Sequence, residues 1–405
     1  MTHEYIIVGG GAAGASAIEG IRAHDANGSI LLLSRENHPP YHRPPLSKDL
    51  WFGKSTLEQL PVHGDDFYRE HSVELALRRE VIEVDAERRT LWDDHGAEHR
   101  YGKLLLATGG TPRRLNVEGM EHDTVHYVRY LEDYLYLRER IPRVQHALVL
   151  GSGFIGMEIA AALRHAGCDV TLLYPEQYPL HKVLPRDLAL FVADYYRQQG
   201  VETVSGEAAV RFEPHGDEIV VMTNGGNTVT TQLVVAGLGV EPAADLAEGA
   251  GLAVDDGIEV DEFGRTSDPY IYAAGDVAEF PCIPLDRPMR CEHWDHAIHH
   301  GRAVGANMAG ANRPYTHLPF FYSDLFDLGW EAVGAVEAHL ETHAVWKQEY
   351  REGVVYYLWD DIVRGILLWN TWNAVDWARA LIEERRPMTR EEREAAVPGG
   401  AAPSA

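Results

Sequence analysis

Gly9-Gly10-Gly11-Ala12-Ala13-Gly14 directly follows the apolar run Tyr5-Ile6-Ile7-Val8. An apolar strand, a G-x-G-x-x-G turn and a helix-like stretch in this order predict a dinucleotide-binding unit. The first glycine, Gly9, allows a tight turn, and the second, Gly11, lets a pyrophosphate approach the backbone. The third, Gly14, lets helix and strand pack closely. The start of the helix then offers free N–H groups and a partial positive charge to phosphates.

The same pattern occurs a second time in the chain. Gly151-Ser152-Gly153-Phe154-Ile155-Gly156 follows the apolar run Ala147-Leu148-Val149-Leu150. One such motif is weak evidence, since glycine-rich turns also occur without a ligand. Two motifs, each between a strand and a helix, indicate that two dinucleotides meet in one protein.

Composition excludes several other classes of protein. The 405 residues are enough for two or three hydrophobic cores. The three cysteines, Cys168, Cys282 and Cys291, are far apart and form no C-x-x-C pair. This argues against a disulfide scaffold, a zinc site and a dithiol redox centre, so no metal site is predicted. Without a targeting segment or an apolar run of about 18 residues, we expect a cytoplasmic protein with no membrane span.

The net charge of −26 also limits the partners. Nucleic acids and anionic membrane surfaces are repelled by a strongly acidic protein. The simpler interpretation of the charge is a solvated acidic surface. We therefore expect no nucleic acid among the partners.

Apolar patterning predicts alternating strands and helices in the first three quarters of the chain. Apolar and polar residues alternate from Val81 to Trp92, which predicts a hairpin. Residues 103–110 are predicted to end a buried strand. Further predicted elements are a helix at 156–166, strands at 170–173, 233–237 and 271–276, and a helix at 297–309. Strand-like runs at 330–336, 354–359 and 365–369 precede a helix at 374–384, which predicts a separate aromatic-rich domain. Residues 387–405 have no apolar period and read as a flexible tail.

Several motifs in this order resemble a known family of flavoproteins. They are the two glycine turns, Ala107-Thr108-Gly109-Gly110, Ala273-Ala274-Gly275-Asp276, and the loop from Pro40 to Trp51. Together they are similar to the ferredoxin-reductase-like FAD/NAD(P)-dependent flavoproteins and, within these, to apoptosis-inducing factor and its bacterial relatives. The likeness covers roughly residues 4–385. Tyr174-Pro175-Glu176, Lys182–Pro185, Glu292–Ala297 and Gly365–Asn370 agree with it.

This resemblance implies an α/β fold with two Rossmann-like dinucleotide-binding domains in a glutathione-reductase-like arrangement, plus a C-terminal α+β domain. The implied FAD-binding domain is discontinuous, with residues 1–115 and 242–316. The implied NAD-binding domain spans 116–241 and the C-terminal domain 317–386. The implied cofactors are one FAD per chain and NADH.

For FAD, the first glycine turn holds the pyrophosphate, and a carboxylate about 20 residues further on usually binds the adenosine ribose. At the position where the family has this carboxylate, the chain has Arg35, and Glu36 follows it. Either Glu36 reaches the ribose or the guanidinium replaces the carboxylate, and we favour Glu36. Asp276 resembles the aspartate that binds the ribityl chain, unless it only caps a helix. The resemblance also implies that His293 and Trp294 begin a helix near the pyrimidine edge of the flavin. The further implied FAD-binding residues are Arg43, Ala107, Thr108, Gly109, Gly275, Glu292, His293 and Trp294.

Lys48 resembles the family lysine beside flavin N5, paired with Glu158 on the helix of the second glycine turn. Such a pair holds two charges behind a desolvated ring and shapes the local potential. These two residues are the predicted catalytic residues. The alternative for Lys48 is an ordinary solvated loop lysine.

For the nicotinamide nucleotide, the second glycine turn is followed by Glu176 at the end of the next strand. A carboxylate there accepts hydrogen bonds from ribose hydroxyls and repels a 2′-phosphate, which favours NADH over NADPH. The resemblance adds Lys182 and Gly239. Phe154 is predicted where a nicotinamide stacks, although packing against the sheet is nearly as plausible. His293, Tyr322 and Glu331 match family positions that line the pocket, with Tyr322 in place of a frequent tryptophan.

The implied function is that of an FAD-dependent NADH oxidoreductase, in which hydride passes to flavin N5 and electrons then pass to an acceptor. The resemblance implies a ferredoxin as the electron acceptor, and a quinone is the alternative acceptor. A homodimer is also possible for this family. An acidic carrier would need a basic patch, for which Arg287 and Arg290 are the only hint. The alternative function is a redox-responsive scaffold like apoptosis-inducing factor, with slow turnover and a stable complex of reduced flavin and NAD⁺.

Overall fold

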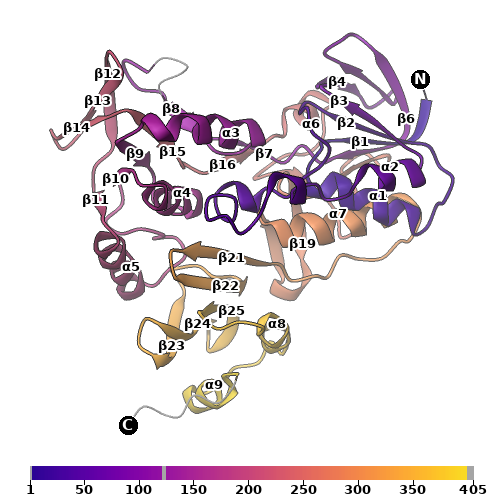
Figure 1. Cartoon of the computed structure of the whole chain (residues 1–405). Coiled ribbons are helices and arrows are strands. Elements are labelled where there is room, and N and C mark those ends of the chain that lie inside the picture. Colours follow the sequence, from indigo (N-terminus) through magenta and orange to yellow (C-terminus); the bar gives the residue numbers. More distant parts are fainter. Residues whose placement is uncertain (1, 121–124, 399–405) are drawn as a thin grey trace. The chain divides into compact units, whose positions relative to one another are not determined.

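The computed structural model describes residues 2–120 and 125–398 of the chain (Figure 1). They form two compact units. Unit 1 contains residues 1–42, 57–111 and 241–319, and unit 2 contains 43–56, 112–240 and 320–405. The chain passes between the units at residues 42/43, 56/57 and 319/320, and near β7 (Gly110–Pro112) and β16 (Val240–Pro242).

Unit 1 is built on one sheet with the strand order β3-β2-β1-β6-β5-β4, to which β18 adds beside β6. Its strands are β1 (Thr2–Val8), β2 (Ile30–Ser34), β3 (Val73–Leu77), β4 (Val81–Asp85), β5 (Thr90–Asp93), β6 (Glu98–Leu106) and β18 (Ile271–Ala273). Strands β3, β2, β1, β6 and β18 are parallel, whereas β4 and β5 form the predicted antiparallel hairpin. Parallel strands covered on both faces have continuous apolar runs, which explains the sequence of β1 and β2.

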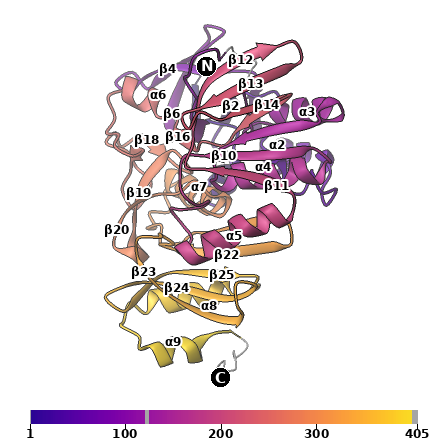
Figure 2. The ribbon, with the colours of Figure 1, turned by 90° about the vertical axis from the view of Figure 1, so that its left-hand side faces the viewer.

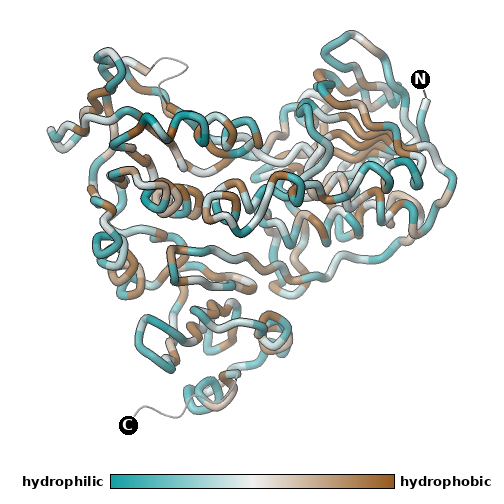
Figure 3. Tube along the Cα trace, in the orientation of Figure 1, coloured by the Kyte–Doolittle hydropathy of each residue, from teal (hydrophilic) through white to brown (hydrophobic). Residues whose placement is uncertain are grey.

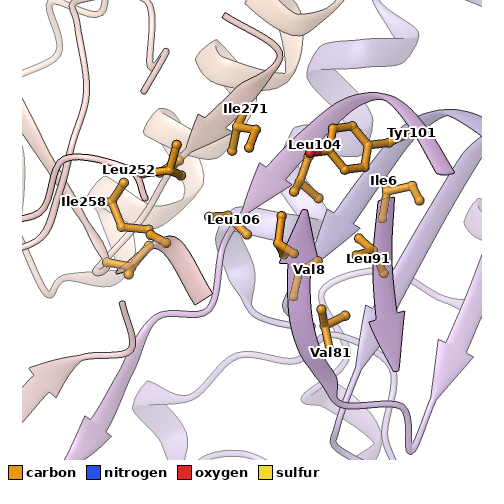
Figure 4. Packing of buried hydrophobic residues seen from close by; sticks show 14 of the residues in the cluster. Ile6, Val8, Val81, Leu91, Tyr101, Leu104, Leu106, Leu252, Ile258 and Ile271 are labelled. Atoms are coloured by element: carbon orange, nitrogen blue, oxygen red, sulfur yellow. The ribbon is translucent and has the colours of Figure 1, made fainter. Parts of the chain in front are cut away.

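The two faces of this sheet bury alternate residues of each strand. Ile6 and Val8 of β1 point into one cluster, which also contains Leu252 and residues of α6 (Asp245–Gly249) (Figure 4). Tyr5 and Ile7 point to the opposite face and pack with residues of α1 (Ala12–Arg22) and α7 (Trp294–Met308). The period of two in a strand produces this division.

Helices α1 and α7 lie side by side on that second face (Figure 1). A Cβ at Gly301 would overlap the carbonyl of Ala13, and one at Gly305 would overlap that of Ala17. Glycines at these positions therefore let the two helices approach closely. Helix α7 begins at Trp294, three residues before the predicted start.

The remaining elements of unit 1 are shorter. They are η2 (Leu57–Gln59), α2 (Asp65–Glu70), η4 (Ile283–Leu285) and a three-stranded sheet of β17 (Ile258–Glu259), β19 (Ala278–Cys282) and β20 (Arg287–Arg290). In Figure 3 the strands of the main sheet are mostly hydrophobic, whereas α1 and α7 carry both colours, as expected for helices with one buried face.

Unit 2 contains a second parallel sheet with the order β11-β10-β9-β15-β8. Its strands are β8 (Val125–Tyr127), β9 (His146–Leu150), β10 (Asp169–Tyr174), β11 (Val201–Ser205) and β15 (Leu233–Ala236). Its helices are α3 (Leu131–Arg140), η3 (Ile141–Arg143), α4 (Phe154–His165) and α5 (Arg186–Gln198), and β12 (Ala209–His215), β13 (Glu218–Thr223) and β14 (Thr228–Thr231) form an antiparallel sheet.

The C-terminal part of unit 2 is an antiparallel sheet with the order β21-β22-β25-β24-β23. Its strands are β21 (Phe320–Leu325), β22 (Leu328–Gly334), β23 (Glu341–Gln348), β24 (Glu352–Trp359) and β25 (Ile362–Trp369). Trp330 and Trp369 are cross-strand partners and fully buried, as expected for core residues. Helix α8 (Val375–Glu383) packs against β22 and β25 (Figure 2).

The structure differs from the sequence prediction at the end of the chain. Instead of a flexible tail from residue 387, helix α9 spans Arg390–Ala396 and starts with a capping box of Thr389 and Glu392. Arg393 and Met388 are buried, and the backbone carbonyl of Arg393 accepts a hydrogen bond from the Tyr356 hydroxyl. Arg393 was missed because a single buried cationic residue produces no apolar period.

Residues 43–56 also lie elsewhere than expected. We assigned them to the first dinucleotide-binding domain, but they group with unit 2. The segment contains the 3-10 turn η1 (Pro44–Leu46) and is held by polar contacts, among them a 3.3 Å hydrogen bond from the Tyr134 hydroxyl to the carbonyl of Leu50.

Candidate functional site

The glycines of the first turn have distinct roles. Gly9 has φ +124°, and a Cβ there would overlap the carbonyl of Ala107. A Cβ at Gly14 would overlap the carbonyl of Gly9, whereas a Cβ at Gly11 would meet nothing within 4 Å. Gly9 and Gly14 are therefore needed for the packing of the protein itself. Gly11 instead leaves open space beside the backbone, which a pyrophosphate can fill.

The second turn repeats this division of roles. Gly151 has φ +96°, and a Cβ there would overlap the carbonyl of Gly237. A Cβ at Gly156 would overlap the carbonyl of Gly151, and a Cβ at Gly153 would meet nothing within 4 Å. The two turns thus place an open backbone position at the same point of the motif.

The helices that follow these turns have N-termini suited to an anion. Gly11 and Gly153 are the N-cap residues of α1 and α4, and neither helix has an acidic residue in its first turn. In α3, by contrast, the Asp133 carboxylate accepts the backbone N–H of Tyr130. Since neither helix has a side-chain cap or an acidic residue in its first turn, the dipoles at the starts of α1 and α4 suit a phosphate. Both turns therefore fit a dinucleotide.

Ala107, Thr108 and Gly109 close the end of β6 rather than presenting side chains. The Ala107 N–H donates to the carbonyl of Val8, and the Thr108 hydroxyl donates to that of Ala243 (2.7 Å). Gly109 has φ +70°, and its carbonyl accepts the Ala243 N–H. These contacts fix the backbone beside the first glycine turn.

Arg35 and Glu36 point to different partners. Arg35 forms an ion pair with Glu80 at 3.6 Å, with both side chains about half exposed. The Glu36 carboxylate accepts a 2.5 Å hydrogen bond from the Tyr41 hydroxyl. Glu36 lies two residues beyond β2, next to the turn-bearing strand β1. Which of Arg35 and Glu36 would contact an adenosine ribose stays a prediction.

Asp276 does not begin a helix, contrary to our expectation. It lies between β18 and β19, in a turn where the Ala278 N–H donates to the carbonyl of Gly275. The reason is the left-handed conformation of Gly275, at φ +78°, which turns the chain back into a strand. The alternative that Asp276 merely caps a helix is therefore wrong.

The start of α7 lies in unit 1. His293 is its N-cap residue, and the Trp294 indole donates a 3.0 Å hydrogen bond to Nδ1 of His42. Burial lowers the pKa of His42, so its ring is neutral and can accept this bond. Glu292 is exposed and paired with Arg290 at 2.5 Å.

Lys48 and Glu158 form the predicted ion pair, with Nζ 3.1 Å from Oε1. Both side chains are buried, at 7% and 4% exposure. Nζ also donates to the carbonyl of Tyr322 at 3.0 Å and lies 3.9 Å from the centre of the Tyr322 ring. Lys48 is thus a buried, fixed cation rather than a solvated loop lysine.

The Glu158 carboxylate receives two further hydrogen bonds. The Ser47 hydroxyl donates to Oε2 at 2.6 Å, and the Ser323 hydroxyl donates to Oε1 at 2.7 Å. Sequence reasoning missed both serines. Their only signal was their position next to the predicted residues Lys48 and Tyr322, since a hydroxyl at one end of a sheet has no motif of its own.

Tyr322 and Glu331 are directly opposite each other on β21 and β22. Burial, with the nearby carboxylates Asp49 and Glu158, raises the pKa of Tyr322 to about 12, so its hydroxyl stays protonated. Burial also raises the pKa of Glu331, whose Oε2 is buried and has no hydrogen-bond partner in the part of the chain that the structure describes. Arg43 lies in the same unit, and its guanidinium donates to the carbonyl of Arg129 at 2.8 Å.

Phe154 packs within unit 2. Its ring centre is 5.6 Å from that of Phe321 and 5.6 Å from that of Trp330, which agrees with the packing alternative. Glu176 lies two residues beyond β10, partly exposed, with His181 3.9 Å away. Lys182 and Gly239 are exposed.

Cysteine chemistry has no support in the described part of the chain. Its cysteines are three, all buried and free. Burial raises the pKa of Cys168 and Cys291, which disfavours their thiolates. Among residues 2–120 and 125–398, no helix is both long and apolar enough to cross a membrane.

Comparison with known proteins agrees with this geometry. Residues 3–301 match the family model described as pyridine nucleotide-disulphide oxidoreductase. Residues 304–349 and 347–384 match the model for the C-terminal region of mitochondrion-associated apoptosis-inducing factor. The chain is 35% identical to the seedling isozyme of monodehydroascorbate reductase from Cucumis sativus over 364 residues, with 82% of each chain covered.

Ferredoxin reductases resemble the chain over more of its length. Putidaredoxin reductase from Pseudomonas putida is 32% identical over 389 residues, which cover 95% of this chain and 92% of the relative. The crystal structure of a ferredoxin reductase from Rhodopseudomonas palustris superposes with a TM-score of 0.90 at 30% identity and covers 96% of both chains. The predicted fold class and the resemblance to ferredoxin reductases and apoptosis-inducing factor are thereby confirmed. The chain belongs to the pyridine nucleotide-disulphide oxidoreductase family, as a flavoprotein oxidoreductase of the kind that uses FAD and NAD(H).

Proposed function

We propose that the protein oxidises NADH with FAD and passes the electrons to a small iron–sulfur carrier of the ferredoxin type. The observation that carries this proposal is the pair of glycine turns with the same division of roles, open at Gly11 and at Gly153. The family relatives named as ferredoxin and putidaredoxin reductases support the choice of acceptor.

FAD is assigned to unit 1. The N-terminus of α1 and the backbone at Gly11 hold the pyrophosphate, and Glu36 holds the adenosine ribose. Asp276 holds the ribityl chain, and the start of α7 at His293 and Trp294 directs its dipole at the flavin. When bound, FAD supplies an acceptor for hydride and a store from which electrons leave one at a time.

NADH is assigned to unit 2. The N-terminus of α4 and the backbone at Gly153 hold its pyrophosphate. Glu176, at the carboxyl end of β10, accepts hydrogen bonds from the ribose hydroxyls and repels a 2′-phosphate. Glu331 offers a buried oxygen with no hydrogen-bond partner among the described residues, which suits the carboxamide of the nicotinamide.

Lys48 would supply a fixed positive charge to the hydride-transfer chemistry. Its ammonium is held by Glu158 and by the Tyr322 carbonyl, so it does not have to reorient during the reaction. Ser47 and Ser323 hold the Glu158 carboxylate in turn. In this assignment Lys48 is catalytic, whereas Glu158, Ser47 and Ser323 position it.

Stopped-flow mixing without oxygen tests this function. The purified FAD-loaded protein is mixed with NADH or NADPH and then with an oxidised ferredoxin. We expect rapid bleaching of the flavin by NADH, at least about tenfold slower bleaching by NADPH, and rapid recovery of colour with ferredoxin. A long-lived reduced flavin–NAD⁺ complex that ferredoxin does not reoxidise would instead favour the redox-responsive scaffold.

A further inference from the structure

Asp295, His299 and His317 form a cluster of metal-ligand side chains in unit 1. One donor atom from each lies within 4.8 Å of the other two. We propose that these residues bind a divalent transition metal, Zn²⁺ in the first place. The cluster shares no residue with the dinucleotide sites proposed above.

Two elements bring the cluster together. Asp295 and His299 are one turn apart on α7, where residues i and i+4 share a face. His317 lies in the segment between α7 and β21. The Asn307 side chain bonds the N–H and the carbonyl of Arg313, and the Tyr315 N–H donates to the carbonyl of Glu262. The protein itself therefore fixes the path of this segment, so that little ordering is left for a metal to impose.

The distances are close to those of a metal site. Nε2 of His299 is 3.4 Å from Oδ1 of Asp295, and Nε2 of His317 is 2.6 Å from Oδ2. In tetrahedral Zn²⁺ sites with bonds of about 2.0 Å, neighbouring ligand atoms are roughly 3.3 Å apart. The first pair has about this spacing but involves Oδ1, whereas the second pair involves Oδ2 and needs to open by roughly 0.7 Å.

The two imidazole rings stack beside the same carboxylate. Their centres are 3.9 Å apart and their planes differ by 21°, and both Nε2 atoms face the same carboxylate. Asp295 is nearly buried, at 7% exposure, so its charge is poorly compensated by water. A divalent ion between the three groups would bring two positive charges to that carboxylate.

The ligand set selects the class of metal. Two imidazoles and one carboxylate suit Zn²⁺, Co²⁺ or Ni²⁺, whereas Mg²⁺ and Ca²⁺ prefer oxygen ligands alone. His299 is 42% exposed and lines a cavity of about 520 Å³ together with Arg302 and Arg313. Water can therefore reach the fourth position of a tetrahedral ion. Bound metal would tie the first turns of α7 to the segment that precedes β21.

No metal site was predicted from the sequence because that prediction depended on the absence of cysteine pairs. The signal was weak: an Asp-x-x-x-His pair on a helix and a histidine 18 residues further on. His317 comes close to Asp295 and His299 only because the segment after α7 runs back beside that helix.

Zinc titration of the full-length, FAD-loaded protein after treatment with a chelator tests the proposal. We expect one Zn²⁺ per chain by isothermal titration calorimetry. His299→Ala and His317→Gln are expected to weaken binding at least about tenfold. In His317→Gln a side-chain amide can still donate a hydrogen bond to Asp295 but is a poor zinc ligand. His339→Ala serves as the matched control, since it removes a surface histidine that lies 3.5 Å from the carboxylate of Glu337, outside the cluster.

Thermal unfolding gives a second readout that does not depend on NADH oxidation. Zn²⁺ at about 100 times its Kd is expected to raise the apparent Tm by roughly 3–5 °C in the parent protein and not in His317→Gln. Bound FAD, measured by absorbance, reports that each variant is folded. Absence of saturable zinc uptake, or equal affinity in the parent and both cluster variants, would show that the three residues form only a hydrogen-bonded group.

Discussion

The Lys48–Glu158 ion pair places two opposite charges inside unit 2. Removing only one partner leaves the other charge buried, which costs about 3 kcal/mol or more. We expect Glu158→Gln and Lys48→Met each to lower the free energy of unfolding of unit 2 by about this amount, measured by urea denaturation. The double variant is expected to lose clearly less than the sum, because it leaves no unpaired charge.

The exposed pair Lys347–Glu352 provides the control for this cycle. Its side chains are 68% and 39% exposed, so removing either is expected to cost less than about 1 kcal/mol. If the double variant lost as much free energy of unfolding as the two single variants together, Lys48 and Glu158 would be solvated independently.

Glu331 makes stability depend on pH. Burial raises the pKa of its carboxyl above the ordinary value of 4.5, so the unfolded chain releases this proton at a lower pH than the folded chain. The folded state is therefore favoured below pH 4.5 and loses that advantage as the pH rises through the folded pKa. Glu331→Gln is expected to raise the apparent Tm by roughly 1–3 °C at about pH 8, with a smaller gain at about pH 5. A gain that is the same at both pH values would exclude ionisation of Glu331 as the cause.

At the scale of elements, each strand–turn–helix unit uses different glycines for packing and for binding a dinucleotide. Gly14→Ala is expected to destabilise the apoprotein by about 3 kcal/mol, because its Cβ would overlap the carbonyl of Gly9. Gly11→Ala has space in the protein and an ordinary φ of −95°, so it is expected to leave stability unchanged within about 0.5 kcal/mol. It is nevertheless expected to weaken FAD binding at least about tenfold, measured by flavin release on dilution.

The second turn offers the matched comparison. Gly153→Ala is expected to raise the KM for NADH while leaving bound flavin unchanged, and Gly156→Ala to disturb the packing of α4. If Gly153→Ala released FAD instead, the assignment of the two turns to two different dinucleotides would be wrong.

At the scale of the whole molecule, the charge of −26 governs encounters with other proteins. The basic patch suggested from Arg287 and Arg290 is weak, because Arg290 is 3.2 Å from Asp256 and 2.5 Å from Glu292. We therefore expect the rate constant for reoxidation by an acidic ferredoxin to rise several-fold between about 10 and 150 mM NaCl, since salt screens the repulsion.

Stopped-flow reoxidation over this salt range measures the effect, with a neutral quinone as the control acceptor. The quinone rate is expected to be nearly independent of salt. A ferredoxin rate that falls as salt is added would reveal a complementary positive surface.

Much of the fold followed from local patterns. Strands β1 and β9, their glycine turns and the following helices were predicted because apolar periodicity and the steric freedom of glycine are properties of short segments. The strands of the C-terminal sheet β22, β24 and β25 were found in the same way, whereas β21 and β23 were missed. The Lys48–Glu158 pair came from resemblance to a family, since no local pattern joins residues so far apart.

The sequence by itself determined two dinucleotide-binding units, the family and the residue types available at the site. Only the tertiary structure decided that Ser47 and Ser323 converge on Glu158, that α9 packs its buried Arg393 onto the C-terminal sheet, and that His317 meets Asp295 and His299. The physical reason is range. Backbone preferences and apolar periods act between neighbours in the chain, whereas a hydrogen bond or a ligand set depends on which distant segments the fold brings within about 3 Å.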